Sequence, residues 1–383
     1  MHFTNFIPTS EIWLYVFVAL SFLLFIQVFY YFYFFQKLNR FINRQSKTDS
    51  NKYPPLSVVI CAKNESKNLK ANLPYILNQE YPGEFEVIVV NDASEDETEL
   101  ILAQFKEKNK HLYYTSIPYD KIFQHGKKLA MTIGIKAAKN NHMVFTDADC
   151  IPATNNWLKH MAEGFAEGKE IVLGYGIYKK QKGFLNYWIR FDTFTIAMQY
   201  FSYALRGIAY MGVGRNIAYT KDLFYKHEGF KKHQHILSGD DDLFIRDAAT
   251  KSNVAIVTHP DSYTISEPRK SFKEWRRQKS RHLTTSPHYK SKIKIILGIE
   301  VLSRQLFWAL SLFFIFFPTF APSIFLLIII KLLVQTLVLN ALTKKTRQRD
   351  LTFGGIILDF ILPLVTGLLL LGGKRQAKKS KWT

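Results

Sequence analysis

The chain has 383 residues, of which 48% are apolar and 15% aromatic, and its formal net charge is +20. This length allows about two or three domain-sized units, and so high an apolar fraction excludes a disordered chain. The positive charge alone would suit nucleic acid, but much of it flanks long uncharged segments, where Lys and Arg contact anionic lipid headgroups. We therefore expect membrane lipids, and no nucleic acid, as partners.

The first long uncharged segment is residues 13–35, which can cross the roughly 30 Å hydrocarbon layer as a helix. No Lys or Arg precedes this segment, whereas Lys37, Arg40, Arg44 and Lys47 follow it. A cleaved signal peptide would have a basic start and a shorter apolar stretch, so we expect a retained anchor. The positive-inside rule then predicts an external N-terminus and a cytoplasmic central region.

Two further spans are expected at residues 295–317 and 323–342, followed by a basic cluster at 344–349. Glu300 and Arg304 lie one helical turn apart in the first of them. They could pair within the helix, or they could line a polar path for a sugar chain, as charged residues at membrane depth often do. The sequence leaves both alternatives open.

The last apolar segment, residues 353–371, is long enough to span, but it contains Asp359, Pro363 and Gly367 and precedes a basic tail. A simple crossing would put that tail outside, against the positive-inside rule. We therefore favour a re-entrant or interfacial segment, which is tolerated where protein covers broken backbone.

Between the spans, apolar runs that predict strands alternate with helical patterns. The runs are residues 56–61, 85–90 and 143–145, and each ends in polar residues. This alternation is typical of an α/β fold with a mostly parallel sheet. Ligands of such sheets bind at the carboxyl ends of the strands. The polar residues expected to converge there are Asn64, Glu65, Asp92, Asp147 and Asp149.

Asp147 and Asp149, one residue apart after a buried strand, predict a site for a hard divalent cation, Mg²⁺ or Mn²⁺. Taken alone, the two acids could simply be solvated at a strand end. Their convergence with other strand-end acids favours the metal site. The chain has neither a G-x-G-x-x-G nor a G-x-x-x-x-G-K motif, so a metal and basic side chains must hold the phosphates of a substrate.

Six short motifs appear in a fixed order: CAKNE at 61–65, VVNDAS at 89–94, GKK at 126–128, TDAD at 146–149, SGDDD at 238–242 and QKSRH at 278–282. With these motifs the chain resembles the membrane-bound family 2 glycosyltransferases, the group that includes cellulose, chitin and hyaluronan synthases. The resemblance covers about residues 55–282. It implies a GT-A fold that binds a nucleotide-sugar donor and is flanked by transmembrane helices.

The resemblance also implies roles for the donor-binding residues. Ala62, Glu65 and Asp92 are expected to contact the base and ribose of a uridine nucleotide. Lys128 is expected near the uracil or the phosphates, with Lys127 as the second choice. The resemblance further implies that Asp147 contacts the nucleotide, that Asp149 binds the metal that bridges the diphosphate, and that the loop at 212–216 lies near the acceptor.

Inverting transfer needs a carboxylate that takes the proton of the acceptor hydroxyl. By resemblance this base is Asp241, supported by Asp240, with Asp242 third. Arg281 is expected to hold the leaving diphosphate, since a guanidinium suits phosphate oxygens, and Gln278 is expected to contact the sugar or the acceptor.

One residue departs from the family pattern. The last motif ends in His282, where the family has Trp, and the smaller ring offers less apolar surface for an acceptor sugar to stack on. Whether the protein polymerises or adds single sugars therefore stays open.

The sequence thus predicts an inverting glycosyltransferase that moves a sugar, expected to be UDP-linked, to a polysaccharide or lipid acceptor. The alternative is a catalytically inactive relative that binds nucleotide-sugar or scaffolds a polysaccharide-synthesis complex. The expected location is a bacterial inner membrane, with the catalytic domain in the cytoplasm. The expected parts are an anchor (1–36), a basic linker (37–54), a GT-A domain (55–290), a transmembrane helix pair (291–343), and a basic loop with a third C-terminal apolar segment and tail (344–383).

Overall fold

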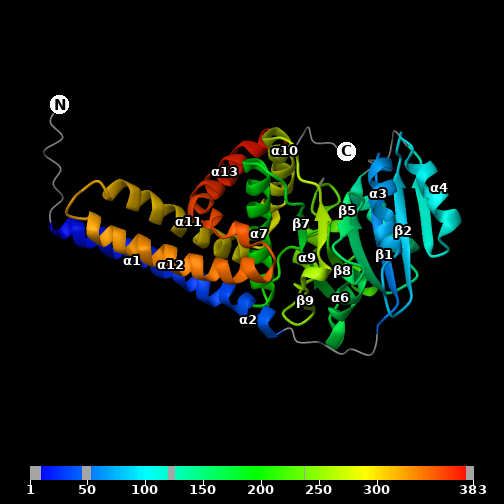
Figure 1. Ribbon diagram of the computed structural model, residues 1–383, viewed down its shortest axis with the longest axis horizontal. Coiled ribbons are helices and arrows are strands. Elements are labelled where there is room, and N and C mark those ends of the chain that lie inside the picture. Colours follow the sequence, from blue (N-terminus) through cyan, green and yellow to red (C-terminus); the bar gives the residue numbers. More distant parts are fainter. Residues whose placement is uncertain (1–9, 45–52, 120–125, 237, 377–383) are drawn as a thin grey trace. The chain divides into compact units, whose positions relative to one another are not determined.

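The computed structural model describes residues 10–44, 53–119, 126–236 and 238–376. The chain divides into two compact units (Figure 1). The helical unit contains the residues up to 41 together with 291–368, and the sheet unit contains residues 42–290 together with those after 368. Each unit is described in turn.

A seven-stranded sheet forms the centre of the sheet unit. In spatial order its strands are β3 (Leu112–Ile117), β2 (Phe85–Asp92), β1 (Leu56–Ala62), β4 (His142–Asp147), β8 (Ile217–Thr220), β6 (Ile171–Leu173) and β9 (Val254–Ile256). Neighbours pair in parallel, except that β8 runs antiparallel to both β4 and β6. The expected α/β fold with a mostly parallel sheet is confirmed.

The strand order of this sheet determines where a ligand can bind. All residues of β1 are buried except the half-buried Cys61, as in strands covered on both faces. The order reverses at β1, because β2 and β3 extend the sheet on one side of it and β4 on the other. Ligand sites of open α/β sheets lie beyond the carboxyl ends of the strands at such a reversal. In this chain those ends are Ala62 and Asp147.

The sheet unit also contains α3 (Ser66–Leu77), α4 (Thr98–Lys108), α5 (Lys127–Ala137), α6 (Trp157–Glu163), α8 (Lys221–Lys226) and α9 (Asp242–Ala248). Buried residues such as Leu69 on α3 and Trp157 on α6 join the strands in one core. Helix α5 packs very closely on β1, because a Cβ at Gly134 would lie 2.5 Å from Val59 Cγ1. This close approach fixes α5, and with it the position of its first residue, Lys127.

A second sheet has three strands in the order β5 (Cys150–Pro152), β10 (Thr264–Ser266) and β7 (Gly176–Tyr178). Helix α7 (Phe184–Ala204) follows β7, and helix α10 (Phe272–Leu283) follows β10. Lys279 on α10 and Asp192 on α7 form a buried ion pair, Nζ to Oδ1 2.6 Å, which holds the two helices together. Short 3₁₀ turns complete the unit: η2 (Ala166–Gly168), η3 (Lys231–His233), η4 (Pro260–Ser262) and η5 (Ser286–His288).

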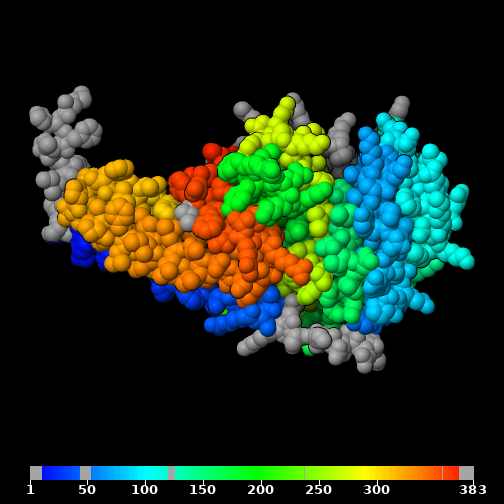
Figure 2. Space-filling model, in the orientation of Figure 1, coloured from blue at the N-terminus to red at the C-terminus, as the bar shows by residue number. Residues whose placement is uncertain are grey.

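The helical unit consists of α1 (Ser10–Tyr30), a π-helical turn η1 (Tyr31–Phe35), α2 (Gln36–Arg44), α11 (Ser291–Phe314), α12 (Ala321–Lys345), η6 (Arg349–Leu351) and most of α13 (Gly354–Gln376). Among the described residues, three helices are long and apolar enough to cross a membrane: Glu11–Asn43, Ser291–Phe314 and Ala321–Lys345. They confirm the three expected spans as helices, except that the second helix ends at Phe314, before the expected end at 317. Figure 2 shows α12, in orange, as an outer surface of this unit, and Ile329 on it is an exposed apolar side chain.

The last apolar segment is one helix, α13, with Pro363 inside it. Its apolar part, Ile357–Leu370, is shorter than the three candidate spans. The backbone is helical throughout 354–376. A helix fits an interfacial segment as well as a span, so the expected re-entrant or interfacial placement stays a prediction.

Four charged side chains of the helical unit form one ion-pair network. Arg304 on α11 contacts Asp359 on α13, Nη1 to Oδ1 2.8 Å, and also Glu300, Nη2 to Oε2 3.3 Å. Lys331 on α12 contacts the other Asp359 oxygen at 2.9 Å and lies 4.7 Å from the ring centre of Trp308. The two negative and two positive charges balance. Of the two alternatives left open for Glu300 and Arg304, the pairing occurs, within a network that joins three helices.

We predict that Asp359→Asn destabilises the helical unit strongly. It leaves two buried cations with one carboxylate, and breaking a buried ion pair from one side typically costs roughly 3–5 kcal/mol. Thermal unfolding in detergent measures the loss. The double variant Asp359→Asn with Lys331→Met restores neutrality and should recover part of it. Equal stability of Asp359→Asn and the unaltered protein would contradict the role of the network.

Candidate active site

Three strands of the large sheet end in residues that we expected at the site. β1 ends at Ala62, β2 at Asp92 and β4 at Asp147. The register pairs Cys61 with Asp147, and Ala62 with Asn91. The structure therefore brings these strand ends together at one edge of the sheet.

The loops after β1 and β2 are tied to each other by hydrogen bonds. The backbone N–H of Asn64 donates to Ser94 Oγ at 2.8 Å, and that of Glu65 donates to Thr98 Oγ1 at 3.0 Å. Asn64 and Ala93 have φ of 55° and 50°, in the left-handed region. Such strained backbone persists only where its surroundings impose it, and it is frequent at functional sites. The two loops thus form one rigid rim.

The three expected nucleoside contacts differ in exposure. Ala62 and Asp92 are fully buried, whereas Glu65 is half-buried. Burial, together with the nearby charges of Asp149 and Asp147, raises the pKa of Glu65. Beside this rim, a pocket of about 350 Å³ opens at the ends of β2 and β3, and it is lined by Asn91, Ala93, Ser94, Glu95, Glu99, Ser116, Ile117, Pro118 and Tyr119.

Asp147 is the last residue of β4, and Asp149 directly precedes β5. Possible ligand atoms of Asp147, Asp149 and Cys150 all lie within 4.8 Å of one another. Burial and the charge of Asp147 raise the pKa of Asp149, and burial raises that of the Cys150 thiol well above its usual value. A protonated thiol is a poor ligand, so the carboxylates form the donor set. Two desolvated, repelling carboxylates fit a hard divalent cation.

Lys127 links this pair to the acidic motif before α9. Its Nζ lies 2.8 Å from Asp147 Oδ1 and 3.1 Å from Asp240 Oδ2. Burial alone would raise the pKa of Asp147, but the Lys127 ammonium holds it below its usual value. Lys127 is therefore the cation that balances the first acid of the expected metal pair.

Lys128, our first choice for the contact with the nucleotide, has different partners from Lys127. Its Nζ donates to the backbone carbonyls of His233 and Ile236, both at 2.7 Å, and burial lowers its pKa to about 8. Consecutive helical residues point about 100° apart. At the start of α5, this rotation sends Lys127 to the carboxylates and Lys128 to the loop before the acidic motif.

Asp241 is the N-cap of α9 and sits in a tight backbone cradle. Its Oδ2 accepts from the N–H of Gly214 at 2.7 Å, and its Oδ1 accepts from the N–H of Asp242 at 2.8 Å. A Cβ at Gly214 would lie 3.3 Å from this Oδ2 and 3.2 Å from Lys127 Nζ. Burial and the adjacent Asp240 raise the pKa of Asp241 to about 6. A carboxyl group with such a pKa is suited to accept a proton near neutral pH.

The other two acids of the motif have different partners. Asp240 is buried beside Lys127. Asp242 Oδ2 accepts from Thr285 Oγ1 and from the Tyr289 hydroxyl, both at 2.9 Å. Burial and the charge of Asp241 raise the pKa of Asp242 well above its usual value. Asp242 thus fixes the turn, and Asp241 is the partly exposed member.

Helix α10 carries the expected Gln278 and Arg281. Gln278 Nε2 donates to the Tyr178 hydroxyl at 3.2 Å. Burial raises the pKa of Asp147, and Arg281 is near enough to help Lys127 and Arg215 lower it. His282 has an exposed side chain, yet the surrounding protein and the charges of Arg281 and other basic residues lower its pKa, so its imidazole is neutral.

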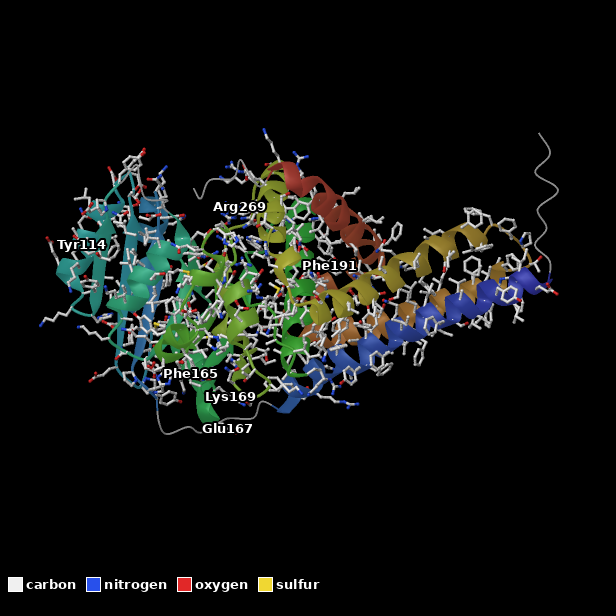
Figure 3. The ribbon with its side chains drawn as sticks, turned by 180° about the vertical axis from the view of Figure 1, so that it is seen from behind. Tyr114, Phe165, Glu167, Lys169, Phe191 and Arg269 are labelled. Carbon is white, nitrogen blue, oxygen red and sulfur yellow. The ribbon has the colours of Figure 1, made fainter. Side chains whose placement is uncertain are left out.

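Two further arginines approach the acids, and sequence reasoning did not single them out. Arg215 lies 4.3 Å from the ring centre of Tyr178, and its guanidinium donates to Ser266 Oγ and to the carbonyl of Gly176, both at 3.2 Å. Arg269, labelled in Figure 3, comes from the segment between β10 and α10. Both oppose the rise in the pKa of Asp149. The only feature of the sequence that pointed to Arg215 was its place in the loop at 212–216.

A second group of possible metal ligands lies on α6 and η4, away from the strand ends: His160, His259 and Asp261. The two imidazole rings lie 4.4 Å apart, and His160 Nδ1 lies 3.0 Å from Glu163 Oε2. Ring contact and this pair account for the group without a metal.

Comparisons with known proteins add to this geometry. Residues 57–227 match the family model described as Glycosyl transferase family 2. The match contains β1, β2, β4 and both acids of the metal pair, whereas Asp241 and Arg281 lie beyond its end.

Curated proteins similar to the chain include poly-β-1,6-N-acetyl-D-glucosamine synthases of Staphylococcus. The one from Staphylococcus epidermidis is 30% identical over 151 residues, which are 39% of this chain and 34% of the relative. The one from Staphylococcus aureus strain COL is 28% identical over 121 residues, which are 32% of this chain and 28% of the relative. The chain thus matches about a third of the length of these relatives.

Among solved structures, a mannosyltransferase of Pyrobaculum calidifontis in complex with GDP-Man and Mn²⁺ is similar, with a TM-score of 0.59 and 18% identity. The similarity covers 96% of this chain and 99% of that one. At this identity it concerns the fold, which is of the GT-A type.

Proposed function

We propose that the protein is an inverting glycosyltransferase that uses a nucleotide-diphosphate sugar, because residues 57–227 match the family model described as Glycosyl transferase family 2. Its acceptor is a polysaccharide or a lipid presented at the cytoplasmic face of the membrane. The observation that carries the proposal is the Lys127 ammonium, which contacts both Asp147 and Asp240. One side chain thus contacts an acid proposed to bind the metal and an acid proposed to support the base. This contact supports a single site for metal binding and proton transfer.

Asp147 and Asp149 are the residues that would hold Mg²⁺ or Mn²⁺. A bound divalent cation supplies positive charge to the diphosphate as it leaves. The proposal is supported by the donor set, since the carboxylate oxygens of Asp147 and Asp149 lie within 4.8 Å of each other.

Asp241 is the proposed base, and Asp240 supports it. As the acceptor oxygen attacks the anomeric carbon, Asp241 takes the hydroxyl proton and the diphosphate leaves from the opposite face. The N–H of Gly214 and the N–H of Asp242 orient the carboxylate. A preoriented base avoids reorganisation during the reaction.

Arg281 is proposed to hold the leaving diphosphate, and Gln278 to contact the sugar or the acceptor. Arg281 is on α10, and the buried Lys279–Asp192 pair fixes that helix. Arg215 and Arg269 add positive charge near Asp149. Fixed cations stabilise the charge that develops on the departing oxygen.

The nucleoside is proposed to lie against Ala62, Glu65 and Asp92. The pocket of about 350 Å³ at the ends of β2 and β3 offers room beside them. Since curated relatives are named for poly-β-1,6-N-acetyl-D-glucosamine, UDP-linked N-acetylglucosamine is the first donor to test. The GDP-Man of the similar solved structure makes GDP-linked mannose the second.

A nucleotide-release assay tests the proposal. The full chain, purified in detergent, is offered a panel of UDP- and GDP-sugars with Mn²⁺, Mg²⁺ or a chelator, and products are sized. Release of nucleoside diphosphate with one donor, lost with the chelator, is expected. Binding of a sugar nucleotide without release in any combination would favour the alternative, an inactive relative that binds donor or acts as a scaffold.

We predict that Asp241→Asn keeps donor binding and lowers turnover by about 10²–10⁴-fold, the usual contribution of a general base. Calorimetric titration with UDP and product assays separate the two effects. The matched control is Asp222→Asn, an exposed acid at the start of α8, which should turn over normally. Turnover of Asp241→Asn within a factor of a few of the control would refute the assigned base.

We also predict that turnover falls on the acid side. Asp241 accepts a proton only when it is ionised, and its pKa is about 6. The logarithm of kcat/KM should therefore be level above pH 7 and fall with a slope of about one below pH 6. UDP binding measured over the same range separates loss of the base from loss of donor affinity. A kcat/KM that stays level down to pH 4.5 would contradict the prediction.

A further inference from the structure

Lys127 occupies an unusual place for a side chain that would meet a donor phosphate. Its ammonium contacts the first acid of the metal pair at 2.8 Å and Asp240 at 3.1 Å. The side chain of Asp147 is 31% exposed, whereas Asp240 is only 6% exposed. The cation therefore balances charge from two motifs at once.

The surroundings hold the ammonium where it is. Lys127 begins α5, whose packing against β1 is fixed by the close contact at Gly134. On the other side, the ammonium lies 3.2 Å from the point that a Cβ of Gly214 would occupy. A side chain at 214 would be in tight contact with this ammonium, so the glycine gives the cation room.

A divalent cation at Asp147 and Asp149 would share a carboxylate with this ammonium. Two positive charges within a few ångströms repel strongly in a desolvated site. The donor diphosphate removes this repulsion, because its negatively charged oxygens can accept hydrogen bonds from the ammonium and can also attract the metal. The ion pair between Lys127 and Asp147 thus weakens the binding of the metal alone. It does not weaken the joint binding of the metal and a nucleoside diphosphate.

We propose that Lys127 is an internal counter-ion that occupies Asp147 in the donor-free protein and gives it up when the metal and the nucleoside diphosphate arrive together. The inference rests on the proposed metal role of Asp147 and Asp149. It makes Lys127 a positioning residue that enforces joint binding of metal and donor. Lys128, bonded to the carbonyls of His233 and Ile236, has no part in it.

Binding of Mn²⁺ to the full chain in detergent tests the proposal, followed by the electron paramagnetic resonance of free Mn²⁺ with and without UDP. The unaltered protein should bind Mn²⁺ weakly alone and at least ~10-fold more tightly with UDP, a factor of ten corresponding to 1.4 kcal/mol. In Lys127→Met, Mn²⁺ alone should bind about tenfold more tightly. Lys127→Arg keeps a cation and should remain weak, and Lys136→Met, at an exposed lysine in the last turn of α5, is the matched control and should behave like the unaltered protein.

If Lys127→Met does not fold, as judged by circular dichroism, Lys127→Gln takes its place with the same expectation. An affinity for Mn²⁺ alone that is unchanged in the neutral variant overturns the counter-ion. So does a variant that loses UDP affinity with unchanged Mn²⁺ binding, which would make Lys127 a fixed phosphate ligand. The further substitution Asp149→Asn tests the metal site on which this inference rests. If Mn²⁺ still binds to that variant, the proposed metal site is wrong, whatever Lys127 does.

Discussion

Repulsion among carboxyl groups at one edge of the large sheet is the constraint on which the sheet unit depends. In each of two groups the acids perturb one another: burial and Asp240 raise the pKa of Asp241 to about 6 in the turn before α9, and burial and Asp147 raise the pKa of Asp149 after β4. The cations that oppose this repulsion come from separate elements, namely Lys127, Arg215, Arg269 and Arg281. Since no local segment contains both sets, the site is balanced only when the whole unit has folded.

The helical unit meets the same constraint in a different way. Glu300 and Asp359 face Arg304 and Lys331, and the four charges cancel without any added ion. In a low-dielectric surrounding, an uncompensated charge would be costly. The contrast is informative: the helical network is closed by its own side chains, whereas the carboxylates beside β4 retain partly exposed oxygens that a cation from outside can reach.

The sequence predicted the parallel sheet and its strand ends, because buried runs of apolar residues followed by polar ones mark where such strands stop. Asp92 and Asp147 were located in this way. The sequence did not predict that Lys127 rather than Lys128 contacts the carboxylates. Neighbouring helical residues point in different directions, and which of them faces the acids depends on how α5 packs. Arg215 was not predicted for a related reason: it lies in an irregular loop, and such a loop has no periodicity that predicts where a side chain points.

The hydrogen bond from the Tyr289 hydroxyl to Asp242 ties the end of the segment before α11 to the acidic motif. Tyr289 stands two residues before Ser291, where the first helix of the C-terminal pair begins. Asp242 is bonded through its own N–H to the carboxylate of Asp241. The start of that helix is therefore only two residues from a side chain that is linked, through two hydrogen bonds, to the carboxylate of Asp241, the proposed base.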